Sequence, residues 1–237
     1  MNSAFALDHV VIVVRELERA VADYRAAGFT VVPGGQHPGR GTRNALVVFE
    51  DGAYIELIAY DAPSQERWWR VLDAHGEGLV DFALLPRDIA AAVAGARARG
   101  LSGLEERPGS RARPDGVQIA WQSARPATSD LPFLCADVTP RALRVPEGEV
   151  RRHANGATGI ARVKVAVADL QASLARYRAY LGEASVQGHE VPLTGFRIAL
   201  AEDARPRGEG PCEVELRFPP SGGGKHRVEF LEVPFLR

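Results

Sequence analysis

The order of apolar and polar positions over residues 5–60 predicts one strand, one helix and three further strands. Val10–Val14 is a run of β-branched residues, which favours a strand. The next apolar residues recur at i, i+3, i+4 and i+7, which is one face of a helix, and they are Leu17, Ala20, Val21 and Tyr24. Further strands are predicted at Phe29–Val32, Ala45–Phe49 and Ala53–Tyr60. This first unit therefore has the pattern βαβββ.

The same pattern occurs twice more along the chain. The second unit has a strand, a helix face and three strands at Phe82–Leu85, Ile89–Ala96, Leu101–Leu104, Val117–Gln122 and Leu131–Cys135. The third has them at Val163–Val167, Leu170–Leu181, Phe196–Ala201, Cys212–Phe218 and Val228–Val233. Within the second unit, Glu106–Gly116 is predicted as a loop, and the polar segment Pro140–Gly156 is predicted as the boundary before the third unit. We expect paired βαβββ modules in residues 1–142 and a third βαβββ-like module in residues 156–237.

The three units carry different polar residues at one equivalent place. Counting back eight residues from the first apolar residue of each helix gives His9, Asp81 and Arg162. By position alone, a single histidine in a strand is usually a partly buried structural residue. The interest of His9 depends on which side chains lie beside it.

Composition excludes several classes of function. The net charge of −1 gives no strong field for nucleic acid or for an anionic membrane, so neither is expected as a partner. Cys135 and Cys212 are the only two cysteines, which favours a reduced, cytoplasmic setting without a disulfide framework. The N-terminus has no basic region or long apolar run, so we predict neither a signal peptide nor a membrane span. Phosphate-loop, dinucleotide-binding and GxSxG motifs are absent from the sequence.

Three stretches of the sequence resemble one protein family. "LDHVVIVV", "HPGRGTRNALVVFEDGAYIELIAY" and "HGEGLVDFAL" are similar to the glyoxalase-like domain proteins of the vicinal oxygen chelate superfamily, over residues 5 to 140. The resemblance implies an α+β fold in which βαβββ modules form a curved mixed sheet, as in the glyoxalase, bleomycin-resistance and dihydroxybiphenyl-dioxygenase proteins. It also implies a divalent metal such as Zn, Fe, Mn, Ni or Co, bound by residues on the first and last strands of each module.

Carried over to this chain, the resemblance implies His9, Glu56 and Asp81 as metal ligands, with Glu56 also as the catalytic residue. The fourth ligand position falls on Phe133, which cannot bind a metal. One histidine and two carboxylates depart from the usual four-ligand set and from the triad of two histidines and one carboxylate. His75 is an alternative ligand, and Asp81 could instead form a salt bridge or cap a loop.

The substrate is predicted to contact two further groups of residues. In "HPGRGTRNAL", Arg40 and Arg43 could clamp a carboxylate, and Thr42 and Asn44 could line the cup; the alternative is an ordinary hairpin with solvated arginines. Trp68 and Trp69 lie on a predicted connecting helix, where one could fill the core and the other cover a pocket.

The sequence thus predicts a metal-dependent enzyme of isomerase or lyase type that acts on a small oxygenated metabolite, with dioxygenase activity less favoured. The alternative is a metal-free protein that binds or sequesters a small molecule in the same cup. The third unit is predicted to be structural, with Arg162 at a surface or interface, and to leave an open sheet edge that makes a homodimer plausible.

Overall fold

The first two modules close into one eight-stranded barrel in a computed structural model that describes residues 3–203, 205–219 and 227–229. Module one contains β1 (Phe5–Val14), α1 (Leu17–Ala26), β2 (Val32–His37), β3 (Thr42–Val48) and β4 (Tyr54–Tyr60). Module two contains β5 (Gly78–Pro86), α3 (Ile89–Ala98), β6 (Glu105–Ala112), β7 (Gln118–Arg125) and β8 (Phe133–Asp137). Helix α2 (Arg67–His75) joins them. The strands follow the order β1-β4-β3-β2-β6-β7-β8-β5 around the barrel.

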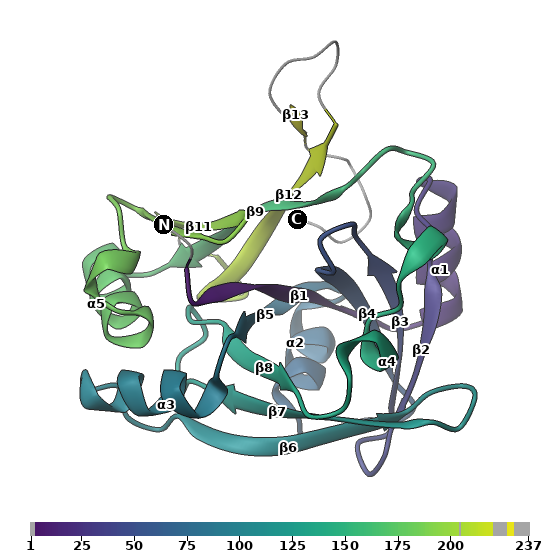
Figure 1. The fold of residues 1–237 in the computed structure, drawn as a ribbon, viewed down its shortest axis with the longest axis horizontal. Coiled ribbons are helices and arrows are strands. Elements are labelled where there is room, and N and C mark those ends of the chain that lie inside the picture. The colour runs from purple at the N-terminus through teal and green to yellow at the C-terminus, as the bar shows by residue number, and fades with distance from the viewer. Residues whose placement is uncertain (1–2, 204, 220–226, 230–237) are drawn as a thin grey trace.

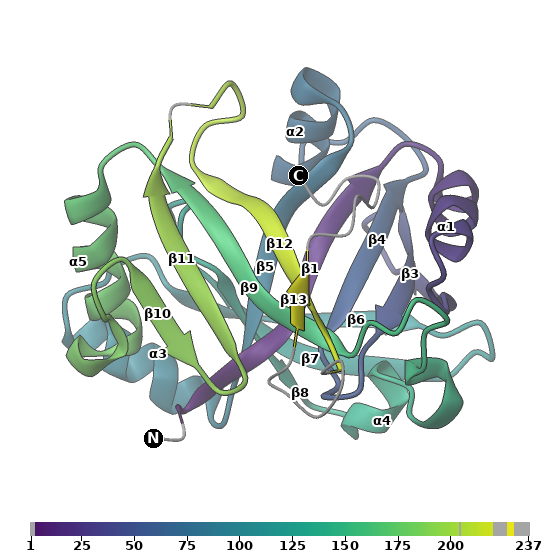
Figure 2. The same ribbon diagram turned by 90° about the horizontal axis from the view of Figure 1, so that it is seen from above.

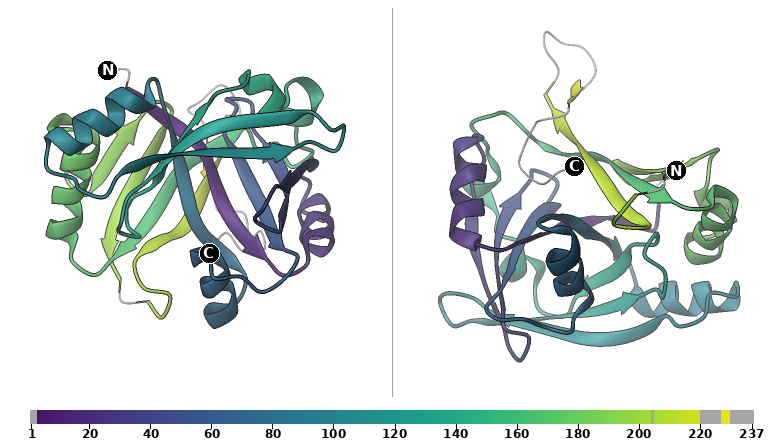
Figure 3. Two further views of the ribbon diagram at one scale, coloured as in Figure 1. Left: turned by 90° about the horizontal axis from the view of Figure 1, so that it is seen from below. Right: turned by 180° about the vertical axis from the view of Figure 1, so that it is seen from behind.

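The predicted fold class, an α+β fold in which βαβββ modules form a curved mixed sheet, is confirmed, with α1 and α3 on the outside of the barrel (Figure 1). Figure 3 shows β6 and β7 crossing the underside of the barrel in the view from below. Three predictions of local structure are wrong. Leu101–Leu104 is irregular, the predicted loop at Glu106–Gly116 is largely strand β6, and β2 lies later in the chain than Phe29–Val32.

Strand β1 separates two apolar clusters because its side chains alternate between the barrel interior and the outer layer. Val11 and Val13 belong to an interior cluster with Ile58 of β4. Val10 and Ile12 belong to the large cluster on the outer side. A β-bulge between Leu7 and His9 interrupts the alternation.

The third unit begins as predicted and then departs from the module pattern. It contains β9 (Gly159–Val167), α5 (Leu170–Leu181), a 3-10 turn at Glu183–Ser185, β10 (Glu190–Leu193), β11 (Phe196–Glu202), β12 (Gly210–Phe218) and β13 (Arg227–Glu229). The strand order is β10-β11-β9-β12-β13, with β11 parallel to β9 and β12 antiparallel on its other side. The sequence prediction had made β11 and β12 successive strands of one βαβββ unit. The predicted strand at Val228–Val233 lies partly outside the described residues.

The third sheet lies beside the barrel, and the two share the outer apolar cluster. Figure 2 shows β11, β9 and β12 side by side, with β12 next to β5 and β1 of the barrel. Val163 and Leu216 of the third sheet belong to the same buried cluster as Val10 and Ile12 of β1. Helices α3 and α5 also lie against each other.

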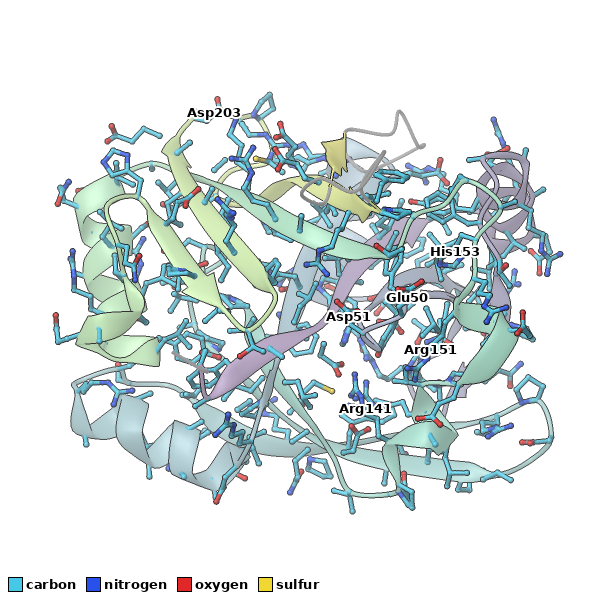
Figure 4. All side chains as sticks on the ribbon, turned by 45° about the horizontal axis from the view of Figure 1, so that its top comes forward. Glu50, Asp51, Arg141, Arg151, His153 and Asp203 are labelled. Atoms are coloured by element: carbon cyan, nitrogen blue, oxygen red, sulfur yellow. The ribbon has the colours of Figure 1, made fainter. Side chains whose placement is uncertain are left out.

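The segment between the second and third units packs against module one. It contains the short helix α4 (Arg141–Arg144) and a 3-10 turn at Gly148–Arg151. Arg141 donates to the carbonyl of Gly52 at 2.9 Å, and Arg151 donates to the carbonyl of Glu50 at 3.4 Å. Figure 4 shows both arginines on the side of the molecule that carries Glu50 and Asp51. The predicted polar boundary is therefore a fixed part of the fold.

Candidate functional site

The interior of the barrel holds a cavity of about 620 Å³. Its walls come from all the barrel strands except β5, together with the start of α2. The buried polar side chains that line the cavity include those of His9, Asn44 and Glu56. These three come from β1, β3 and β4, so the pairing of these three strands assembles the centre of the site.

His9 is held by the residue that precedes it. The bulge in β1 leaves Asp8 out of the regular pairing, and its carboxylate lies 2.6 Å from Nδ1 of His9. Burial alone favours the neutral acid, but the charge of Arg144 and hydrogen bonds from His9 and Arg144 hold the pKa of Asp8 well below its usual value. Because Asp8 is ionised, Nδ1 of His9 donates to it, and Nε2 is left to face the cavity and Glu56.

Glu56 lies between His9 and Asn44. Nδ2 of Asn44 donates to Oε1 of Glu56 at 2.5 Å, and Nε2 of His9 lies 3.6 Å from Oε2. Burial acts to raise the pKa of Glu56, but the charges of His9 and His37, the Asn44 hydrogen bond and the charge of Arg111 outweigh it and lower this pKa below its usual value. The carboxylate is therefore ionised at neutral pH.

His37, at the end of β2, is the second imidazole next to Glu56. Its Nε2 lies 3.9 Å from Oε1 of Glu56, and its Nδ1 lies 3.0 Å from Oγ1 of Thr42. Burial lowers the pKa of His37, with further lowering by the charges of Arg40 and Arg111, against the opposing effect of Glu56. His37 is thus a neutral imidazole at neutral pH. His37 belongs to the motif HPGRGTRNAL, but no role was predicted for it from the sequence.

Asp81, the third predicted metal ligand, is engaged elsewhere. Its Oδ2 accepts hydrogen bonds from Nε1 of Trp68, at 3.0 Å, and from Arg125, with which it forms an ion pair. Its Oδ1 accepts from the backbone of Phe82 at 2.9 Å. The salt bridge that the sequence analysis kept as an alternative is therefore the interaction that Asp81 makes.

The predicted three-ligand metal centre is not assembled among the described residues. His9 and Glu56 come together, but Asp81 does not join them, and the described part of the chain has no group of three or more His, Cys, Asp or Glu side chains placed to bind one ion. The two imidazoles also approach different oxygens of Glu56. Catalytic metal sites usually have at least three protein ligands, so this donor set does not fit such an ion.

The strand registers explain why module two lacks a matching site. Across the antiparallel β1–β5 pair, His9 pairs with Ala83 and Asp81 pairs with Val11. His9 and Asp81 therefore occupy equivalent positions in modules one and two. Glu56 of β4 pairs with Val11 of β1, and Phe133 of β8 pairs with Ala83 of β5. Phe133 therefore occupies in module two the position that Glu56 occupies in module one. Module two also has a bulge, but the residue there is Val80, where module one has Asp8. The carboxylate that would orient an imidazole is thus missing from module two.

The other predicted site residues differ in where they lie. Asn44 lines the cavity beside Glu56, and Trp68 lines it from α2. Arg40 also lines it, in an ion pair with Glu66. Thr42 is buried behind His37, and Trp69 packs against Tyr60 with ring centroids 5.5 Å apart. Neither Thr42 nor Trp69 lines the cavity.

Three further sequence hypotheses concern residues away from the cavity. Arg43 forms ion pairs with Glu18 and Asp61 on the outside of the barrel, so it cannot act as a clamp with Arg40. His75 is exposed at the end of α2. Arg162 forms an ion pair with Glu215 in the third sheet.

Several cavity residues were missed by sequence reasoning, namely Tyr54, Arg111, Trp121, Arg125 and Arg144. Tyr54 could have been found, because it shares a strand face with Glu56 in "YIELIAY"; its ring stacks on that of His9 with centroids 4.7 Å apart. Arg111 and Arg144 come from segments that had been predicted as a loop and as a boundary.

Two βαβββ modules closed around a polar cavity place the chain in the vicinal oxygen chelate superfamily. Within it, residues 7–181 match the model of the glyoxalase-like domain family, and the chain belongs to that family. The match extends beyond the predicted residues 5 to 140 and includes β9 and α5 of the third unit.

Solved structures support the same fold. A hypothetical protein from Staphylococcus aureus is similar over 89% of this chain and 90% of its own, with a TM-score of 0.66 and 15% sequence identity. A mutant of 4-hydroxymandelate synthase from Streptomyces coelicolor is similar over 90% of this chain and 71% of its own, with a TM-score of 0.58 and 14% identity. No curated protein matches the sequence. Among the described residues, no helix has the length and apolar character needed to cross a membrane.

Proposed function

We propose that the protein is an enzyme of isomerase or lyase type that moves a proton on a small oxygenated metabolite bound in the barrel. The observation that supports this proposal is the position of Glu56, an ionised carboxylate that lines the cavity while almost completely buried. A buried carboxylate next to a substrate is a suitable general base, since it is desolvated and fixed by neighbouring groups.

The reaction proposed for this site begins with the transfer of a proton to Glu56 from a carbon that bears a hydroxyl group and lies next to a carbonyl group. The electron pair of the broken C–H bond moves into the carbon–carbon bond, and the carbonyl electrons move onto oxygen, giving an enediolate. Return of the proton from Glu56 to the former carbonyl carbon, together with transfer of the hydroxyl proton to the other oxygen through His9, completes an isomerisation. Loss of a leaving group instead completes an elimination, which is a lyase reaction.

His9 is the second group in this proposal. Asp8 holds its Nδ1, so Nε2 faces both the cavity and Oε2 of Glu56. At this place His9 can exchange a proton with the substrate oxygen while Glu56 acts on carbon. Asn44 fixes the other oxygen of Glu56, which leaves Oε2 for the proton transfer.

Members of the superfamily commonly use divalent metals, and the sequence analysis predicted one here. Binding by His9, Glu56 and Asp81 together requires Asp81 to leave both Arg125 and Trp68. We therefore assign no step of the reaction to a metal, and the roles above belong to the side chains themselves.

Proton exchange with solvent tests this proposal before the substrate is known. A panel of small 2-hydroxy and 2-oxo compounds is incubated with the protein in D2O, and loss of carbon-bound protons is followed by NMR. We expect exchange with at least one compound, and a fall of about 10²–10⁴-fold in Glu56→Gln, the usual contribution of a general base. Glu50→Gln, an exposed change just before β4, is the control and keeps the wild-type rate.

Exchange at the wild-type rate in Glu56→Gln would contradict the role of Glu56.

A second function, binding without catalysis, is favoured by one observation: six arginine side chains line the cavity. A wild-type protein that binds members of the panel and exchanges no proton in any of them supports this binding function and overturns the proposed enzyme.

A further inference from the structure

The cavity wall is rich in arginine. Six arginines line it, and the carboxylates among the lining residues are those of Glu56 and Glu66. The arginines are Arg40, Arg67, Arg107, Arg111, Arg125 and Arg144. This excess contrasts with the net charge of −1 for the whole chain, so positive charge is concentrated at the cavity.

Most of these arginines already have a carboxylate partner. Arg144 pairs with Asp8 and Asp137, and Arg125 pairs with Asp81. Arg40 pairs with Glu66, and Arg107 pairs with Glu105. These ion pairs neutralise much of the wall and hold the guanidinium groups in place.

Arg111 is the exception among the buried ones. Its side chain comes from β6, the residue is only 3% exposed, and it lines the cavity. Within the described part of the chain it forms no ion pair, and its hydrogen bond goes to the backbone carbonyl of Arg144 at 3.1 Å. Arginine stays protonated in proteins, so Arg111 carries a buried charge whose hydrogen-bonding capacity is mostly unused.

Arg111 also lies close enough to the centre of the site to influence it. Its charge acts on Glu56, which it favours in the ionised form, and on His37, which it favours in the neutral form. An anion bound to Arg111 would therefore lie close to Glu56, the proposed base, in the same cavity. This position suits a substrate with its charged group adjacent to the reacting carbon.

We propose that the cavity binds a small monocarboxylate, with the carboxylate group on the guanidinium of Arg111 and the rest of the molecule against the aromatic wall. The planar fork of a guanidinium matches the two oxygens of a carboxylate. A single unpaired guanidinium matches one negative charge, which favours a carboxylate over a phosphate dianion. Trp68, Trp121 and Phe133 supply flat apolar surface for the body of the molecule.

This inference names the substrate class of the proposed function and depends on it only in taking the cavity as the substrate site. It is tested by binding alone. Benzoate is the probe, and benzamide is its neutral counterpart of nearly equal shape. Binding is measured by calorimetry and by quenching of tryptophan fluorescence, which reports on the cavity because Trp68 and Trp121 line it.

Wild-type protein is expected to bind benzoate at least tenfold more tightly than benzamide. Arg111→Gln should lose at least tenfold in benzoate affinity and leave benzamide affinity unchanged. Arg111→Lys, which keeps the charge without the fork, should fall between the two. Arg152→Gln is the control, because the Arg152 side chain is 76% exposed, is paired with Glu149 and does not line the cavity; its benzoate affinity should stay within about twofold.

Unchanged benzoate affinity in Arg111→Gln would overturn the inference, and so would tighter binding of inorganic phosphate than of benzoate by the wild type. If Arg111→Gln does not fold, Arg111→Lys carries the test alone, and benzoate affinity equal to that of the wild type then counts against the inference. The two proposals fail separately. Glu56→Gln should still bind benzoate, because Arg111 is intact in that variant. If the wild type binds benzoate through Arg111 but exchanges no substrate proton, only the proposed enzyme is contradicted.

Discussion

Asp8 connects His9 to the rest of the molecule. It is completely buried and accepts hydrogen bonds from His9 on one side and from Arg141 and Arg144 of the linker on the other. A buried carboxylate with several charged donors is stabilised only while all of them are present. The orientation of His9 therefore depends on residues more than a hundred positions away in the sequence.

The ionisation of Asp8 gives a prediction about stability and pH. The pKa of Asp8 is well below 3.8 in the folded protein, so this residue contributes stability that is present above about pH 4 and is lost as pH falls toward its folded pKa. Asp8→Asn should lower the free energy of unfolding by about 3 kcal/mol near neutral pH, since it removes a buried charged partner. The difference from the wild type should shrink as pH falls below about 4, because the unfolded state then binds a proton that the folded state does not.

Urea unfolding of both proteins at several pH values measures this difference. Asp203→Asn is the matched control, because Asp203 is exposed at the far end of the third sheet (Figure 4). A gap between wild type and Asp8→Asn that stays constant down to about pH 3 would show that the Asp8 carboxylate is not held in its ionised form.

Gly34 determines where the Asn44 side chain can lie. A Cβ atom at Gly34 would lie 2.1 Å from Oδ1 of Asn44 and 2.8 Å from its Cγ, far inside normal contact. Gly34→Ala should therefore displace Asn44 and break its hydrogen bond to Glu56. Since this bond lowers the pKa of Glu56, we expect that pKa to rise in the variant.

NMR titration of protein labelled with ¹³C at the glutamate carboxyl carbons measures this pKa without any substrate. The control is Gly95→Ala in α3, where the nearest atom to the added Cβ is the end of the Arg99 side chain, at 3.2 Å. An unchanged Glu56 titration in Gly34→Ala would mean that Asn44 has no influence on the base.

At the scale of elements, the sequence predicts those with regular patterns. Helix α5 was predicted with its observed bounds, Leu170–Leu181, and β4 was displaced by one residue at its start. Both have continuous periodicity, so local pattern and tertiary structure agree. The central strands β1 and β5 were found for the same reason, and with them His9 and Asp81.

The elements that were missed are those in which tertiary pairing overrides local preference. Strand β2 reads "VPGGQH", and its proline and glycines suggest a turn. Gly35 is needed there because the carbonyl of Ala112 on β6 leaves no room for a side chain, and Gly34 makes room for Asn44. Strand β6, "EERPGSRA", is held by pairing along its whole length with β7. His37 and Arg111 lie on these two strands, which is why sequence reasoning assigned neither a role.

The third unit shows a similar limit. Residue spacing in the sequence predicted that Arg162 is equivalent to His9, and the strand pairing agrees with this. Strand β9 pairs with β12 in the antiparallel way that β1 pairs with β5. Each pair has a bulge, next to Arg162 in one and next to His9 in the other. The counterpart of Asp8 is here Ala161, however, and Arg162 pairs with Glu215. The backbone pattern is repeated, while the groups that make the site in module one are not.

At the scale of the whole molecule, the barrel and the third sheet share one apolar cluster. Leu216 and Val163 of the third sheet are fully buried in the cluster that also contains Val10 and Ile12 of the barrel. Polar contacts add to this: Tyr177 and Tyr180 of α5 donate to the carbonyls of Asp130 and Pro132, at 2.7 Å and 2.9 Å. Separation of the two parts would expose this surface and leave those buried groups without partners.

The shared cluster predicts that the two parts unfold together. Leu216→Ala removes a buried side chain from the third sheet and should lower the free energy of unfolding by about 2–5 kcal/mol. Trp68 and Trp69 lie on α2, which joins the first two modules, and Trp121 lies on β7. The third sheet has no tryptophan, so tryptophan fluorescence reports on the barrel and its connecting helix. If barrel and third sheet form one cooperative unit, the fluorescence midpoint in urea shifts as far as the midpoint measured by circular dichroism. The contrary outcome is a fluorescence transition that stays at the wild-type midpoint, with a separate early transition in circular dichroism. This result would show that the barrel is stable without the third sheet. It would also show that the linker, which positions Asp8 and His9, stays in place without that sheet.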